Sequence, residues 1–284
     1  MHNKTLLGLV PAALLAISCE KAPAESGKIP ISITTSVTKV TDTAYETGDA
    51  VGLYVASHPA SLRQSGNHAD NVKFTFNGAG WVTDNRLYWQ DDKTAADFHI
   101  YFPYSASASV DSHSFSVQRD QSTEAGYKAS EFLVGSSLGI APTPDPVMVS
   151  TRHIMSCIEV ELKAGSGWTD SEIATASVSI TGLQTSAKIN LSDGSISASG
   201  NTADIRPLSL GGGRYRAIAV PQEVKDADLV RITIGNNIYT LNTSVSLASG
   251  RRHKCGITVS RTGEGINIGI DPWEDGDEFS GTVE

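Results

Sequence analysis

The sequence predicts an all-β protein made of two tandem antiparallel β-sandwich domains. No stretch keeps an apolar period of 3.6 residues over several helical turns, whereas short runs that alternate apolar and polar residues recur along the chain. Gly, Asn and Asp separate several of these runs, as expected for hairpin turns. Strands without intervening helices pack as antiparallel sandwiches, and 284 residues suffice for two such cores.

The first expected strand runs from Lys28 to Val37 and has one apolar face, because successive side chains of a strand point to opposite sides. The residues on this face are Ile29, Ile31, Ile33 and Val37. Turn residues predict four hairpins, at positions 76–78, 193–194, 235–237 and 262–265. Further strands are expected at 50–56, 97–102, 114–118, 130–135, 154–162, 176–181 and 215–220.

The division between the two domains is expected near Ala164 to Gly167, a run of small and flexible residues. The N-terminal sandwich would then span residues 28–166 and the C-terminal sandwich residues 167–284. A Pro-rich stretch at 141–146 is the rival boundary, but such stretches also form loops between the strands of one sandwich.

Residues 1–18 have the features of an export signal. Lys4 supplies a positive charge, and the mostly apolar run from Leu6 to Ile17 is too short to cross a bilayer as a helix. Cys19 follows the small residue Ser18, an arrangement similar to a lipobox, in which the cysteine is acylated and becomes the first residue of the mature protein. The acyl chains would hold the protein on a membrane, with residues 19–27 as a tether.

The charge of the chain argues against a nucleic-acid partner. The formal net charge is −9, and Arg251 to Lys254 is the main basic cluster. Affinity for nucleic acid requires many cationic contacts with phosphates, so no such partner is expected.

Patterns that could carry catalysis or bind a metal are better explained as structure. Gly135 to Gly139 satisfies the G-x-S-x-G pattern around Ser137, but the Pro-rich stretch after it cannot form the helix of a nucleophile elbow. The acidic residues at 271–278 lack the alternating spacing of a calcium loop, and no H-x-H or H-E-x-x-H pair supports zinc. The sequence therefore predicts no enzyme activity, no metal and no cofactor.

Two cysteines remain after Cys19, and an exported protein could pair them. Alternation places Cys157 on a face with two glutamates, whereas Cys255 is in phase with Ile257 and Val259. An unpaired state is the favoured interpretation, and the question stays open at this point.

Several short segments occur in an order and spacing that resemble one protein family. They are residues 45–54 (YETGDAVGLY), 97–104 (DFHIYFPY), 117–122 (VQRDQS), His153 at the start of a strand, 219–222 (AVPQ) and 270–273 (IDPW). Together with the lipobox-like start, this set is similar to the fimbrillins, the subunits of type V pili of Gram-negative gut and oral bacteria. Thr151 departs from the pattern, since the family usually has Phe two residues before the histidine.

The resemblance implies that binding, and not bond-making, is the function. Fimbrillins have transthyretin-like sandwich domains and travel as lipoproteins to the outer membrane. A trypsin-like protease then removes the first strand, and a strand from a neighbouring subunit fills the groove and polymerises the pilus. In this chain the removed strand would carry Ile29, Ile31, Ile33 and Val37, and Lys39 matches the cleavage position, where stalk subunits usually carry Arg.

The resemblance also implies the partners, which are other pilus subunits, identical or different, the outer membrane, and host or bacterial surface ligands for adhesion. The candidates for the donated strand are Ile266, Ile268, Ile270, Phe279 and Val283. A cleaved first strand would suit a stalk subunit and a retained one an anchor, so stalk, tip and anchor roles stay open.

The alternative function is a glycan-binding lipoprotein of the same outer membrane. Its candidate sugar-binding residues are Trp81, Trp89, Trp168 and Trp273. Core packing is the more common role of tryptophan, so the pilus function is preferred.

Overall fold

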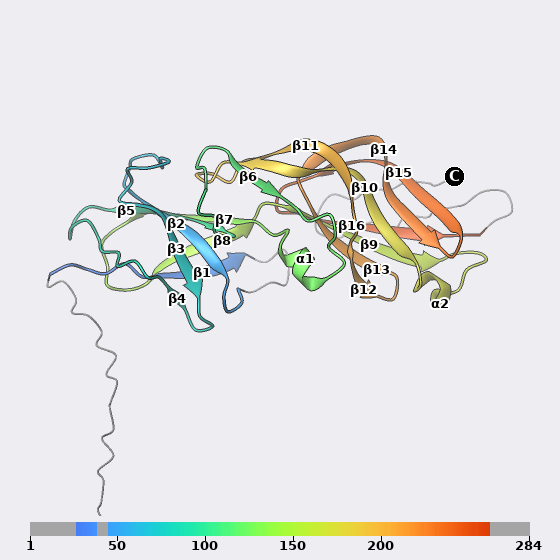
Figure 1. Cartoon of the computed structure of the whole chain (residues 1–284), viewed down its shortest axis with the longest axis horizontal. Coiled ribbons are helices and arrows are strands. Elements are labelled where there is room, and N and C mark those ends of the chain that lie inside the picture. The colour runs from blue at the N-terminus through green and yellow to red at the C-terminus, as the bar shows by residue number, and fades with distance from the viewer. Residues whose placement is uncertain (1–26, 39–44, 262–284) are drawn as a thin grey trace, which may run out of the picture.

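The strands form one N-terminal sheet and a pair of C-terminal sheets in the computed structural model, which describes residues 27–38 and 45–261 (Figure 1). The N-terminal sheet has seven strands in the order β1-β8-β7-β5-β2-β3-β4. Their bounds are β1 Ile33–Thr38, β2 Ala50–Ser57, β3 Ala69–Phe76, β4 Trp81–Val82, β5 Ala96–Phe102, β7 Leu133–Ile140 and β8 Val147–His153. This sheet surrounds its own apolar cluster, which includes Ile33, Leu53, Phe98 and Val149.

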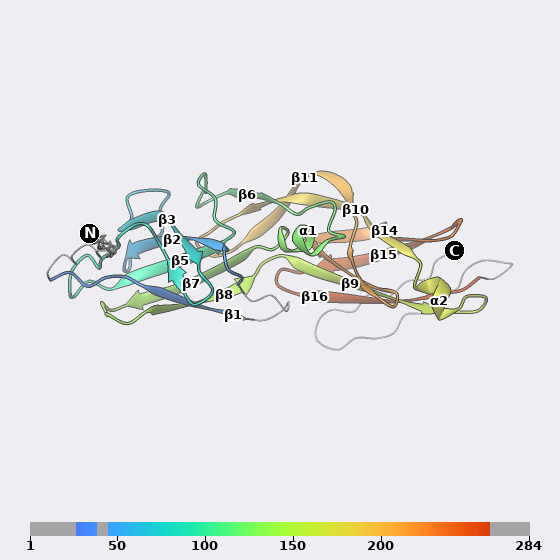
Figure 2. The same cartoon turned by 60° about the horizontal axis from the view of Figure 1, so that its bottom comes forward.

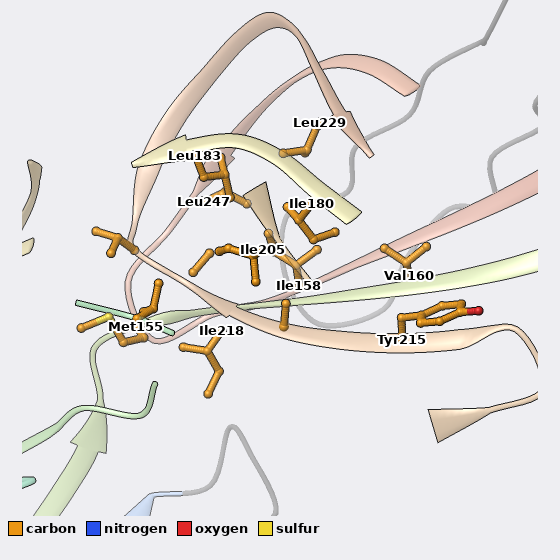
Figure 3. Packing of buried hydrophobic residues seen from close by; sticks show 14 of the residues in the cluster. Met155, Ile158, Val160, Ile180, Leu183, Ile205, Tyr215, Ile218, Leu229 and Leu247 are labelled. Atoms are coloured by element: carbon orange, nitrogen blue, oxygen red, sulfur yellow. The ribbon is translucent and has the colours of Figure 1, made fainter. Parts of the chain in front are cut away.

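The C-terminal part is a sandwich of two sheets. One contains β11-β10-β14-β15, with β6 also paired to β10, and the other has the order β12-β13-β9-β16. The bounds are β6 His113–Ser116, β9 Ser156–Ala164, β10 Ser177–Ile189, β11 Ile196–Ile205, β12 Leu208–Gly211, β13 Arg214–Ala219, β14 Gln222–Ile234, β15 Asn237–Leu247 and β16 Arg252–Val259. Figure 3 shows the core between them, where Ile158 and Val160 of one sheet lie towards Ile180 and Leu183 of the other.

Two short helices interrupt the strands, α1 Glu124–Lys128 and α2 Asp170–Ile173. Each begins after a threonine cap: the Thr123 hydroxyl accepts from the Gly126 N–H, and Thr169 forms a reciprocal capping box with Glu172. Within the residues that the structure describes, no helix is long and apolar enough to cross a membrane.

The expected antiparallel pairing holds for most strands, but two pairs are parallel. β1 pairs with β8, and β16 pairs with β9, each in a parallel register. Both β1 and β16 are the last strands of their sheets and reach their partners through long connections. Hairpin turns impose antiparallel pairing only on strands that they join, so turn chemistry could not predict these two pairs.

The sheets do not divide where the run of small residues predicts. β9 lies before residue 166 but belongs to the same sheet as β13 and β16. By sheet membership, the division falls between His153, which ends β8 instead of opening a strand, and Ser156, which begins β9. Alternating burial is the same on both sides of a domain boundary, so it does not reveal which sheet a strand joins.

The segment between β5 and β7 crosses to the C-terminal sandwich and joins the two parts. β6 pairs with β10, and further along this segment Gln121 is fully buried. The Gln121 side chain accepts from the Ile218 N–H (2.8 Å) and donates to the Ile218 carbonyl (2.7 Å), which completes the backbone bonding of β13. This contact gives Gln121 in the 117–122 segment a structural role.

Most turn predictions are confirmed, whereas two strands, β8 and β12, were missed. The turns at 76–78, 193–194 and 235–237 lie between β3 and β4, β10 and β11, and β14 and β15. The fourth turn, at 262–265, lies outside the described residues. β8 was not predicted, although its residues alternate between buried and exposed from Val147 to His153.

Candidate functional site: the groove of the first strand

The first described segment fills a gap between two parts of the N-terminal sheet. Its first half pairs with residues 87–89: the Ile31 N–H donates to the Leu87 carbonyl, and the Trp89 N–H donates to the Ile29 carbonyl, both at 2.9 Å. Pro30, between them, has no N–H and needs no partner there. Figure 2 shows the second half, β1, running along β8 at the edge of the sheet.

The apolar face of this segment points into the core, as the alternation predicts. Ile31 and Ile33 are 7% and 5% exposed, and Ile29 is half-buried against the same cluster. The backbone of Val37 pairs with Thr151, but its side chain lies outside the described part. Burying the two inner isoleucines contributes roughly 3–6 kcal/mol to holding the segment in place.

A hydrogen bond joins the two ends of the seven-stranded sheet. Trp81 lies on β4, at the opposite end of the sheet from β1, yet its indole Nε1 donates to the Thr35 hydroxyl at 3.0 Å. Thr35 is in phase with Ile31 and Ile33, so its hydroxyl points to the inner face. The sheet therefore curves back on itself, and the first segment closes it.

Tyr45, the first residue that the structure describes after residue 38, covers the end of the groove. Its ring packs edge-on against Trp81 and Phe102, with ring centroids 4.9 and 5.7 Å apart. Its hydroxyl lies 3.1 Å from the hydroxyl of Thr151, and burial raises the pKa of Tyr45 to about 12. Trp81, Phe102 and Thr151 all lie outside β1, so these contacts would remain if the chain between β1 and Tyr45 were cut.

Thr151, the residue that departs from the family pattern, makes a polar contact that Phe could not make. It is fully buried on β8, and its hydroxyl donates to the carbonyl of Ser36 in β1 at 3.2 Å. A side chain of the sheet thus binds the backbone of the first strand in addition to the β1–β8 ladder.

The remaining predicted site residues lie outside the described ranges. These are Cys19, Lys39, Ile266, Ile268, Ile270, Phe279 and Val283. The pattern of the sequence did not indicate that Thr35 and Trp81 meet in the groove. The inward phase of Thr35 could have been read from the alternation, but its contact with a strand 46 residues away could not.

The arrangement around Ser137 differs from a nucleophile elbow. The whole segment from Gly135 to Gly139 is part of β7, and the Ser137 hydroxyl donates to the Met148 carbonyl at 2.7 Å. An elbow presents its serine on a sharp turn before a helix, whereas β7 continues to Ile140 and a loop follows. The motif is part of a strand.

The described tryptophans do not form an exposed platform. Trp89 and Trp168 are 4% and 8% exposed, and Trp81 is half-buried in the groove. Trp273 lies outside the described residues. Sugar-binding faces need exposed rings, so these three side chains favour core packing. No group of His, Cys, Asp and Glu within 27–38 and 45–261 is arranged to hold a metal ion.

Cys157 and Cys255 should not react with a thiol reagent in the folded protein. Both are unpaired and buried, and burial raises the pKa of each to about 12. At pH 8 such a thiol has roughly a thousandth of the thiolate of an exposed cysteine. A Cys19→Ser chain should therefore remain unlabelled by a disulfide reagent at pH 8, and both thiols should react in guanidinium chloride. Labelling of the native protein would contradict the burial.

The raised pKa values of these two thiols predict how the free energy of unfolding depends on pH. Their folded pKa lies above the unfolded value, so their contribution is complete below about pH 8.5. It is lost as the pH rises towards 12, because the unfolded chain then releases protons that the folded chain retains.

The fold and the groove define an all-β protein with a C-terminal sandwich and an N-terminal sheet that its own first segment completes. The chain belongs to the fimbrillin-like family, whose sequence profile matches residues 38–273. This is a family of fimbrial and cell-adhesion proteins.

Individual relatives cover nearly the whole chain. "Putative fimbrium subunit Fim1C" of Bacteroides uniformis is 22% identical over 297 aligned positions, which cover 97% of both chains. A crystal structure of a "putative cell adhesion protein" from the same species has a TM-score of 0.71 at 20% identity, over 88% of this chain and 98% of that one. A second, from Bacteroides ovatus, has a TM-score of 0.69 at 18% identity, over 87% and 97%. At these identities the structures show a common fold.

Proposed function

We propose that the chain is a structural subunit or an anchor of a type V pilus and that it assembles by β-strand donation. The observation that carries the proposal is the position of β1, an N-terminal edge strand in a groove that closes the sheet. Such a strand can leave without crossing another element, and a strand from another subunit can take its place. The fimbrillin-like membership supports the same function.

The groove makes such an exchange energetically favourable. Removal of the first segment would expose Val147 and Val149 of β8, which are 4% and 0% exposed while it is present. It would also leave the N–H and carbonyl groups of β8 that face β1 without strand partners. An open apolar edge of this kind is an aggregation hazard, so the chain benefits from carrying its own strand until a partner is available.

The N-terminus would determine whether β1 is kept. Acylated Cys19 would attach the precursor to the outer membrane, with the rest of the molecule at the cell surface. Lys39 comes directly after β1, and Tyr45 resumes the described structure on the other side of the gap. Cleavage after Lys39 would release β1 with its lipid anchor, and retention would keep the protein anchored. The donated strand would come from the segment of Ile266, Ile268 and Ile270 or from that of Phe279 and Val283.

Cleavage at Lys39 is the step that tests this function. Brief treatment of the purified chain with a lysine-specific protease, together with its fimbrial partners, should give heat-resistant oligomers on a denaturing gel. A Lys39→Ala chain should give few or none, because β1 remains in the groove.

Lys28→Ala is the matched control, since Lys28 is exposed and lies on the other side of β1. This variant should behave like the wild type. Oligomers that form equally well from Lys39→Ala, or a wild-type chain that never forms them, would overturn the proposal. Sequencing of the N-terminus from cells would then distinguish a processed subunit, which begins at Val40, from an anchor, which begins at acylated Cys19.

A further inference from the structure

On its inner face, the groove has a polar group that contacts a side chain of the strand and not its backbone. The indole Nε1 of Trp81 donates to the hydroxyl of Thr35, and this contact is partly buried. The other inner polar contact, from Thr151, ends on the Ser36 carbonyl, which any strand would supply. Of these two inner contacts, the one from Trp81 therefore depends on the sequence of the strand in the groove.

Thr35 continues a row of residues that point inwards. The row begins with Ile29, Ile31 and Ile33, which pack against the core. A strand that fills the groove must match both parts of the row, with apolar side chains followed by an acceptor two positions after the last of them. Without that acceptor, the Trp81 N–H loses its partner in a partly buried place, which weakens binding.

We propose that Trp81 selects the incoming strand by a Ser or Thr at the position of Thr35, and that the partner strand comes from a different polypeptide. This inference rests on the proposed function. It names the chemistry of the partner, a strand with the pattern apolar-x-apolar-x-(Ser/Thr). Because the selection is made by one indole N–H, it adds specificity to the apolar contacts that supply most of the affinity.

The chain's own C-terminal segments do not satisfy this pattern. If Ile268 and Ile270 take the places of Ile31 and Ile33, the position of Thr35 is occupied by Pro272, which has no hydroxyl. If Ile266 and Ile268 take those places instead, the position of Thr35 is occupied by Ile270. The row of Phe279, Gly281 and Val283 also lacks a hydroxyl.

The alternate rows of the tail that contain a hydroxyl lack the two apolar residues before it. Thr282 could occupy the selected position, but Ser280 and Glu278 would then replace the two buried isoleucines. Reading the tail in the reverse direction does not help, since Thr262 is followed by Glu264 in the place of Ile33. Self-polymerisation through these segments is therefore disfavoured, and assembly with a different subunit is favoured.

Strand re-entry can be measured with synthetic peptides and the full chain. The chain is cut with a lysine-specific protease and mixed with fluorescent peptides that correspond to residues 27–38, and their dissociation rates are compared. A Thr35→Val peptide should dissociate roughly five- to thirtyfold faster than the native peptide, and Thr35→Ser should stay close to native. Ser36→Ala is the matched control, because its exposed hydroxyl contacts Ser150 on the other face. A peptide of residues 264–273 should not compete.

A Trp81→Phe chain keeps the ring and removes the N–H, so it should hold the native and Thr35→Val peptides equally well. If this variant does not fold, the comparison of Val and Ser peptides in the wild-type groove still decides the question. Equal rates for those two peptides would overturn the selection while strand exchange stands. Competition by the 264–273 peptide would overturn the requirement for a different partner. Failure of the native peptide to enter at all would overturn strand exchange, and with it the proposed function.

Discussion

An Ile33→Asp substitution is expected to detach β1 while the rest of the N-terminal sheet stays folded. Ile33 is 5% exposed and points into the cluster that the sheet surrounds. The change removes about 1.5–3 kcal/mol of apolar burial and adds the cost of burying a carboxylate, which is several kcal/mol more. That total is comparable to the whole contribution of Ile31 and Ile33 to docking. Because β1 is an edge strand at one end of the chain, it can leave without unfolding the remaining strands.

Amide hydrogen exchange is the measurement that resolves this local effect. In the variant, protection should be lost at residues 33–38 and reduced at their partners in β8, residues 147–152, whereas β2 and β5 should keep theirs. The open groove should also make the variant self-associate, which sedimentation would detect.

Two further substitutions are controls for Ile33→Asp. Val149→Asp places the same charge in the same cluster but at a fully buried position of β8, an interior strand of the sheet, so it should unfold the whole N-terminal sheet. Ser36→Asp places it on the exposed face of β1 and should leave the exchange pattern nearly unchanged. Unchanged protection of β1 in Ile33→Asp would show that the strand is not a separable element.

Local alternation predicted the parts of the groove that depend on one strand. The inward phase of Ile31 and Ile33 followed from the period of a β-strand, and the turns at 193–194 and 235–237 followed from the backbone preferences of Gly and Asn. These features are determined by neighbours in sequence, so the pattern was sufficient.

Local alternation could not predict the contacts between segments that are distant in the sequence. The parallel pairing of β1 with β8 joins residues more than a hundred positions apart, and nothing in either strand specifies its neighbour or its direction. The Trp81–Thr35 bond depends on the curvature of the whole seven-stranded sheet. The membership of β9 in the C-terminal sandwich is also a tertiary choice, which the flexible residues after it obscured.

Gln121→Ala is expected to destabilise the protein by about 2–5 kcal/mol, the second large effect. The Gln121 side chain is fully buried and bonds both the N–H and the carbonyl of Ile218, and its amide also donates to the Gln118 carbonyl. Truncation leaves these backbone groups of β13 unpaired in the interior, at roughly 1–3 kcal/mol for each. The loss should appear as a lower urea midpoint.

The neighbouring Gln118 supplies the control for this prediction. Its side chain is exposed, and its carbonyl, which Gln121 uses, is unaffected by substitution, so Gln118→Ala should change stability by about 0.5 kcal/mol or less. Gln121→Glu separates shape from bonding, because a carboxylate can still accept from the Ile218 N–H but cannot donate to the Ile218 carbonyl. It should be no more stable than Gln121→Ala. A Gln121→Glu chain as stable as the wild type would mean that the side chain fills space at this position, and that the joint between the two parts of the molecule rests on the pairing of β6 with β10 instead.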